Sequence, residues 1–133
     1  MENKYRFGDK TVTTYIVDKN NVTSLEASDV TKPSDRNFRD AWVLNSDKDV
    51  ITEDVTAAKD LFKDKIRQIR APLLQALDIE YMRLQETDSD TSTVVAKKQA
   101  LRDAPAAAAI SNASTINELK AAWDASVLGA NPY

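Results

Sequence analysis

The stretch that decides the fold is DKIRQIRAPLLQALDIEYMR, residues 64–83. Apolar side chains recur in it every three or four residues, which is the spacing of one face of an α-helix. The same spacing continues on both sides and predicts one long helix over residues 52–86. Thr52 is its expected N-cap, followed by Glu53 and Asp54 in the first turn, where carboxylates suit the helix dipole. At about 1.5 Å per residue, this helix is longer than a compact domain of this size is wide.

Pro72 lies in the middle of this stretch, where a proline removes one backbone hydrogen bond and crowds the preceding turn. Because the apolar spacing keeps its phase through Pro72, we expect one long helix that bends there. The alternative is a boundary, with Pro72 as the first residue of a second helix. Both arrangements change the direction of the helix axis at this point.

Charged residues flank the expected bend. Arg67 can pair with Asp64, and Arg70 can reach Asp64 or the carbonyl of Lys65. Such exposed pairs stabilise a helix by only about a few tenths of a kcal/mol. We therefore interpret the charged residues Arg67, Arg70 and Asp78 as aids to solubility or as contacts for a partner, and Pro72 as shaping the surface for that partner.

Two shorter helices are expected after the long one. Ser89 or Asp90 can cap a helix over residues 91–103. Thr115, followed three residues later by Glu118, has the spacing of a capping box and opens the last helix. The region after the polar N-terminal part is therefore mainly helical, with a short helical turn or loop within residues 106–114 and an extended tail over residues 128–133.

The first part of the chain has the period of β-strands. Residues 11–17 alternate β-branched and aromatic side chains, and residues 5–7 can pair with them across Gly8 and Asp9 as a hairpin. Residues 41–44 form a further short strand. We predict a small antiparallel sheet of two to four strands.

The predicted fold class is therefore α+β. Residues 1–48 form an N-terminal β arm or small sheet, and residues 49–133 form a helical region with one long Pro-bent helix and two shorter helices. A chain of 133 residues has the size of one domain, so we expect the two parts to form one compact unit.

Composition argues against several classes of function. The chain has no histidine, no cysteine and only two glycines, so the commonest general base, thiolate chemistry and a glycine-rich phosphate loop are all missing. We predict a protein that is not an enzyme and has no catalytic residue, cofactor or metal. With 21 acidic and 18 basic residues, no nucleic-acid partner is expected. No apolar run suggests a signal peptide or a membrane span.

The two tryptophans have two interpretations. Trp42, in the expected strand, and Trp123, at the end of the last helix, are core residues if they are buried. If they are exposed, they are anchors for a partner.

Four segments together resemble a module of tailed bacteriophages, over residues 35 to about 123. They are DRNFRDAWVL, DVTAAKDLFKDKIRQIRAPLLQALDIEYMRLQE, VVAKKQALRDAP and ASTINELKAAW. The module is similar to the tail assembly chaperone and tail fibre assembly group. The matching positions are Asp35, Arg36, Trp42, Arg67, Arg70, Pro72, Leu73, Leu74, Asp78, Lys98, Gln99, Leu101, Arg102, Asp103 and Pro105.

This resemblance implies a role in building or attaching tail fibres, with phage tail fibre, tail-tip or capsid proteins as partners. The alternative is a stoichiometric virion protein, such as a capsid decoration protein or a tail or fibre adaptor. Either role implies a homo-oligomer or a larger assembly, in the host cytoplasm during assembly and then in the virion if the protein is incorporated. The expected partner-binding residues are Arg36, Trp42, Arg67, Arg70, Pro72, Asp78 and Trp123.

Overall fold

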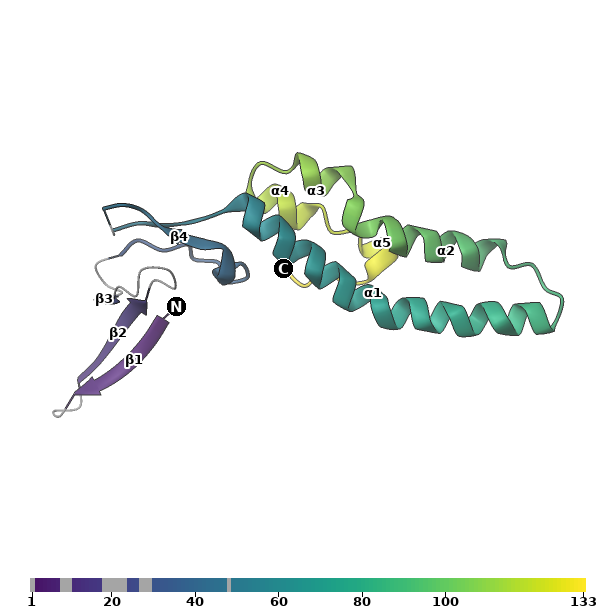
Figure 1. Ribbon diagram of the computed structural model, residues 1–133, viewed down its shortest axis with the longest axis horizontal. Helices are drawn as coiled ribbons and strands as arrows, with labels where there is room; N and C mark the ends of the chain where they lie inside the picture. Colours follow the sequence, from purple (N-terminus) through teal and green to yellow (C-terminus); the bar gives the residue numbers. More distant parts are fainter. Residues whose placement is uncertain (1, 8–10, 18–23, 27–29, 48) are drawn as a thin grey trace. The chain divides into compact units, whose positions relative to one another are not determined.

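The structure, a computed structural model, describes residues 2–7, 11–17, 24–26, 30–47 and 49–133 (Figure 1). The chain divides into two compact units, Met1–Asp54 and Val55–Tyr133. The first contains the strands and the second contains the α-helices. The predicted α+β class is therefore confirmed.

The first sheet of the N-terminal unit has three antiparallel strands in the order β1-β2-β3. They are β1 (Glu2–Phe7), β2 (Thr11–Val17) and β3 (Ser24–Glu26). Phe7 pairs with Thr11 in the register of β1 on β2, which confirms the hairpin expected there. The turn expected at Gly8 and Asp9 lies outside the described residues.

A separate two-stranded antiparallel sheet follows, made of β4 (Trp42–Leu44) and β5 (Ile51–Glu53). A short 3₁₀ helix, η2 (Arg39–Ala41), leads into it. The side-chain oxygen of Asn45 accepts hydrogen bonds from the backbone N–H groups of Asp49 and Val50 and so closes the hairpin. Its small core consists of Val30, Trp42 and Ile51, with Leu44 packed against them.

The expected helix start at Thr52 is wrong. Thr52 is a residue of β5 and pairs with Val43, and α1 begins only at Val55. Asp54, directly before the helix, donates its backbone N–H to the carbonyl of Ala41 at 2.8 Å. Pairing with β4 holds Thr52 in the extended conformation of a strand, so the helix starts only after β5 ends.

Helix α1 (Val55–Glu86) runs without interruption for 32 residues and contains Pro72 in its interior. The alternative with a helix boundary at Pro72 is therefore wrong, and one continuous helix is confirmed. The axis of α1 changes direction in the middle of the helix (Figure 1). Its buried side chains, Ala58, Phe62 and Ile66, all lie before Pro72.

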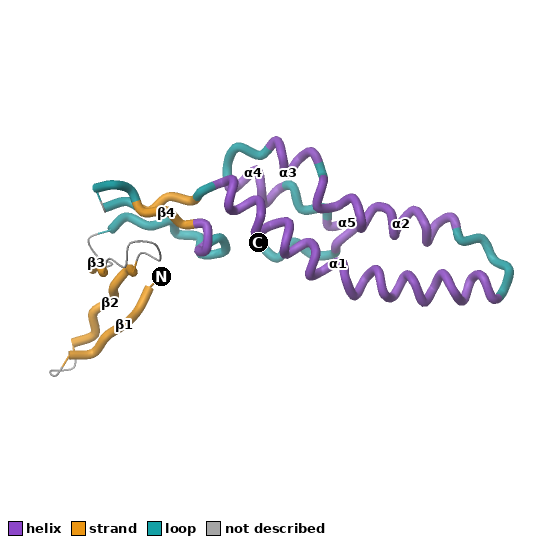
Figure 2. The backbone as a smooth tube through the Cα atoms, in the orientation of Figure 1, coloured by secondary structure: helices purple, strands orange, loops and turns teal. Residues whose placement is uncertain are grey.

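Four shorter α-helices complete the second unit (Figure 2). They are α2 (Ser92–Asp103), α3 (Ala108–Asn112), α4 (Ile116–Ala121) and α5 (Ala125–Leu128), with the 3₁₀ helix η3 (Ala104–Ala106) after α2. The sequence predicts α2 and α4; α3 lies where a short helical turn or loop is expected, and α5 is not predicted. Each of these two has at most five residues, too few for a helical period to emerge.

The two predicted short helices begin in different ways. The N-cap of α2 is Thr91, whose side chain makes no capping hydrogen bond, so neither expected cap, Ser89 or Asp90, is correct. Asp90 lies one residue earlier and accepts the backbone N–H of Ser92 at 2.9 Å. The hydroxyl of Thr115 accepts the backbone N–H of Glu118 at 3.1 Å, as the capping box predicts. In return, the Glu118 carboxylate accepts the backbone N–H of Ser114 at 2.7 Å.

Changing Pro72 to alanine should raise the free energy of unfolding by about 1 to 3 kcal/mol, because alanine restores an amide donor and removes the clash with the preceding turn. Urea unfolding followed by circular dichroism measures this. Gln75→Ala, at an exposed position one turn later, is the matched control and should change stability by only about a few tenths of a kcal/mol. A Pro72→Ala protein less stable than the native one would contradict the expectation.

The capping box should give a pH-dependent contribution to stability. Hydrogen bonds from the Ser114 backbone N–H, and then from its hydroxyl, lower the pKa of the Glu118 carboxyl below its ordinary value of 4.5. The fold thus favours the charged form, whose contribution is present above pH 4.5 and is lost as the pH falls through the lower folded-state pKa.

Glu118→Gln keeps an acceptor and removes the charge, so it should be less stable than the native protein at neutral pH. The difference should shrink progressively below pH 4.5. Chemical unfolding of both proteins across this range is the measurement. A difference that stays constant down to about pH 2 would show that the Glu118 charge does not stabilise the helix.

Candidate functional site

Two neighbouring hollows in the helical unit form the candidate site, with volumes of about 470 and 350 Å³. They share Ala100 and Val127 as lining residues, and together we call them the α2–α5 trough. Ligand pockets in proteins span about 300 to 1,000 Å³. The first hollow is lined by Ile66, Ala100, Asp103, Ala104, Ala106, Ala107, Ala122, Asp124, Val127 and Leu128. The second is lined by Leu73, Ala76, Leu77, Lys97, Ala100, Leu101, Ser126 and Val127.

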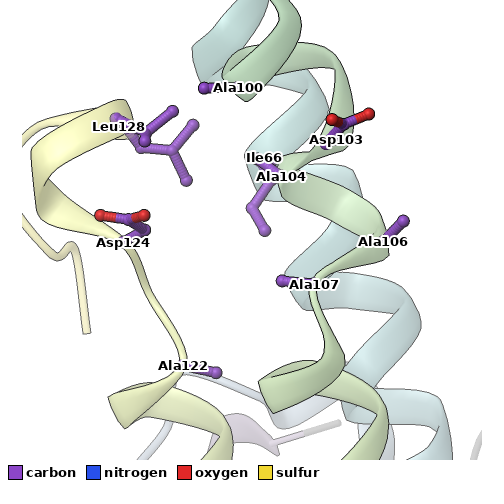
Figure 3. A pocket seen from close by; sticks show the side chains of 10 residues that line it. Ile66, Ala100, Asp103, Ala104, Ala106, Ala107, Ala122, Asp124 and Leu128 are labelled. Carbon is purple, nitrogen blue, oxygen red and sulfur yellow. The ribbon is translucent and has the colours of Figure 1, made fainter.

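Small side chains account for the first hollow. One wall is the end of α2 with η3, and the other is the segment from Ala122 to Leu128, with Ile66 of α1 at the floor (Figure 3). Ala100, Ala104 and Ala107 carry only a methyl group each, so the space between the walls is left unfilled. A wall of alanines lets the backbone or side chain of a bound segment approach closely.

An aromatic cluster holds in place the wall formed by the segment from Ala122 to Leu128. The ring of Phe62 on α1 stacks on Tyr133, with a centroid distance of 5.4 Å, and meets the edge of Trp123 at 5.7 Å. The indole N–H of Trp123 donates to the carbonyl of Gly129 at 3.0 Å, and the side chain of Asn131 donates to the carbonyl of Lys120 at 3.0 Å. The segment containing α5 is thus fixed to α1 on both of its sides.

Polar contacts hold α2, which carries the other wall, along α1. Arg70 donates from Nη1 to the carbonyls of Leu101 and Arg102, at 3.3 and 2.9 Å. A cation suits this position because the last carbonyls of a helix carry partial negative charge. Lys98 pairs with Asp78 at 2.6 Å. These contacts fix the register of α2 on α1 from the end of α2 to its middle.

The ionisable residues that line the two hollows carry charges of opposite sign. The first is lined by two carboxylates, Asp103 and Asp124, and the second by the ammonium group of Lys97. Gln99 donates to Oδ1 of Asp103, and the Ser126 backbone N–H donates to Oδ1 of Asp124. Each of these bonds uses one oxygen of its carboxylate, which leaves the other oxygen able to accept from a bound group.

The half of the α1–α2 hairpin next to the turn that joins the two helices exposes apolar surface. Within residues 71–86 of α1, all of which the structure describes, no side chain is buried. Ile79 and Met82 on α1 and Val95 on α2 are 43, 54 and 47 % exposed. Scattered exposed apolar residues are ordinary in folded proteins.

The residues predicted to bind a partner have different roles in the structure. Arg36 and Pro72 are exposed. Arg67 is also exposed and forms the pair with Asp64, at 2.7 Å, that the sequence predicts. Arg70 does not reach back along its own helix, as expected, because it reaches the carbonyls at the end of α2 instead.

The two tryptophans belong to the cores. Trp42 is 8 % exposed and Trp123 is 6 % exposed, each inside its own unit. Of the two interpretations, the structure therefore supports the core and not the exposed anchor. Trp123 still acts on the candidate site, because it holds the wall that contains α5.

The sequence prediction missed the residues that line the trough, above all Ala100, Ala104 and Asp124. A signal was present, since Ala96, Ala100 and Ala104 recur every four residues and place small side chains along one side of a helix. That α5 would return to face this side could not be inferred from such a short helix.

No group of three or more His, Cys, Asp or Glu residues is placed to hold a metal ion within the described part of the chain. Among the same described residues, none of the helices is both long enough and apolar enough to cross a bilayer. In comparisons with known proteins, no family model, no curated protein and no solved structure matches the chain.

Changing Tyr133 to alanine should lower the free energy of unfolding by about 1 to 2 kcal/mol, because the mutant loses the stacked and edge contacts to Phe62 and Trp123. Tyr133→Phe keeps the ring and should be closer to the native protein. Thermal unfolding of the three proteins measures this. Equal stability of the alanine and native proteins would show that the C-terminal segment is not held by the cluster.

Proposed function

We propose that the chain is a non-enzymatic bacteriophage protein that binds other tail or virion proteins, in the assembly or attachment of tail fibres. The observation that carries the binding role is the α2–α5 trough, a ligand-sized and largely apolar surface on the helical unit. The phage context rests on the sequence resemblance over residues 35 to about 123.

Several features support binding over chemistry. The trough is lined mainly by alanine, leucine, isoleucine and valine, which offer packing surface, together with Lys97, Ser126 and two aspartates. The sequence has no histidine or cysteine, and the two carboxylates of the first hollow come from opposite walls. General acid–base catalysis needs a titrating group within hydrogen-bond reach of a reacting atom, and such a constellation is not suggested by these side chains.

A stoichiometric virion protein is the second candidate. Ile79, Met82 and Val95 do not line the trough, yet they expose apolar surface on the same hairpin. A subunit held between two neighbours in a particle needs two surfaces of this kind, whereas a transient chaperone needs one. In both cases the protein works in the host cytoplasm during assembly, and in the second it remains in the virion.

Quantitative mass spectrometry of purified particles tests the two candidates. An assembly protein should be present only in traces relative to the tail fibre subunits, whereas a structural protein should be present in stoichiometric copies. A protein that neither enters particles nor associates with any tail, fibre or capsid protein during assembly would contradict the proposal in both forms.

Ala100→Leu should block partner binding, because the larger side chain enters both hollows at their shared residue. The isolated protein should keep its fold, since the leucine fills existing space instead of displacing packed atoms. Ala109→Leu, at an exposed position outside the trough, is the matched control. Cosedimentation with purified tails and fibres measures binding, and Ala100→Leu binding as tightly as the control would contradict a role for the trough.

A further inference from the structure

We draw no further inference here: the strongest candidate, the surface that the exposed apolar side chains of Ile79, Met82 and Val95 form on the α1–α2 hairpin, is an unpartnered helix face, and nothing in the structure shows what covers it.

Discussion

The helical unit depends on one contact, the packing of Trp123 and Tyr133 on Phe62 of α1. Phe62 is fully buried, and the two aromatic residues lie more than 60 positions later in the sequence. Bringing such distant segments together costs loop-closure entropy, which has to be offset by burial and by aromatic contacts beyond burial. Once it forms, the chain after α4 is held against α1, and α5 faces α2 across the trough.

The trough forms because the aromatic contacts bring the C-terminal segment back against α1 and because alanines leave space between the two walls. The contacts of Arg70 and Lys98 fix α2 on α1, and the aromatic cluster fixes the segment that contains α5. Both walls are thus held from outside the trough, and the alanines between them are too small to fill the gap. A partner that covers the apolar lining removes it from water, which favours binding. Because contacts outside the trough hold both walls, less conformational entropy is lost in ordering them when a partner binds.

Much of the fold could be predicted from the sequence, because the signals were local. The apolar period through Pro72 predicted one continuous helix, and Thr115 with Glu118 predicted the start of α4. The start of α1 was misplaced because residues 51–53 pair with β4, and pairing with another strand is not visible in a local pattern. The preference of Thr52 for the N-cap of a helix was thus overridden by its strand pairing with Val43.

Most of the candidate site could not be predicted from the sequence, because its contacts join residues that are far apart in the chain. Arg70 and Asp78 were expected to contact a partner protein, but in the structure they bond to α2, about 20 to 30 residues away in sequence. Trp123 offered two interpretations that only its burial could separate. The lining of the first hollow, which includes Ala100, Ala104 and Asp124, comes together only once the C-terminal segment closes on α2.

The chain has no cysteine, so a single introduced cysteine can be labelled selectively. Protection of such a cysteine by a partner is the most direct test of where the partner binds. Single cysteines are placed at Ala100, inside the trough, and at Ser111, an exposed position outside it, and their maleimide labelling rates are compared. Both should react readily in the free protein, and in complexes with purified tails or fibres only the cysteine at position 100 should be protected. Equal labelling of the two in such complexes would show that the partner binds elsewhere and would contradict the central role of the trough.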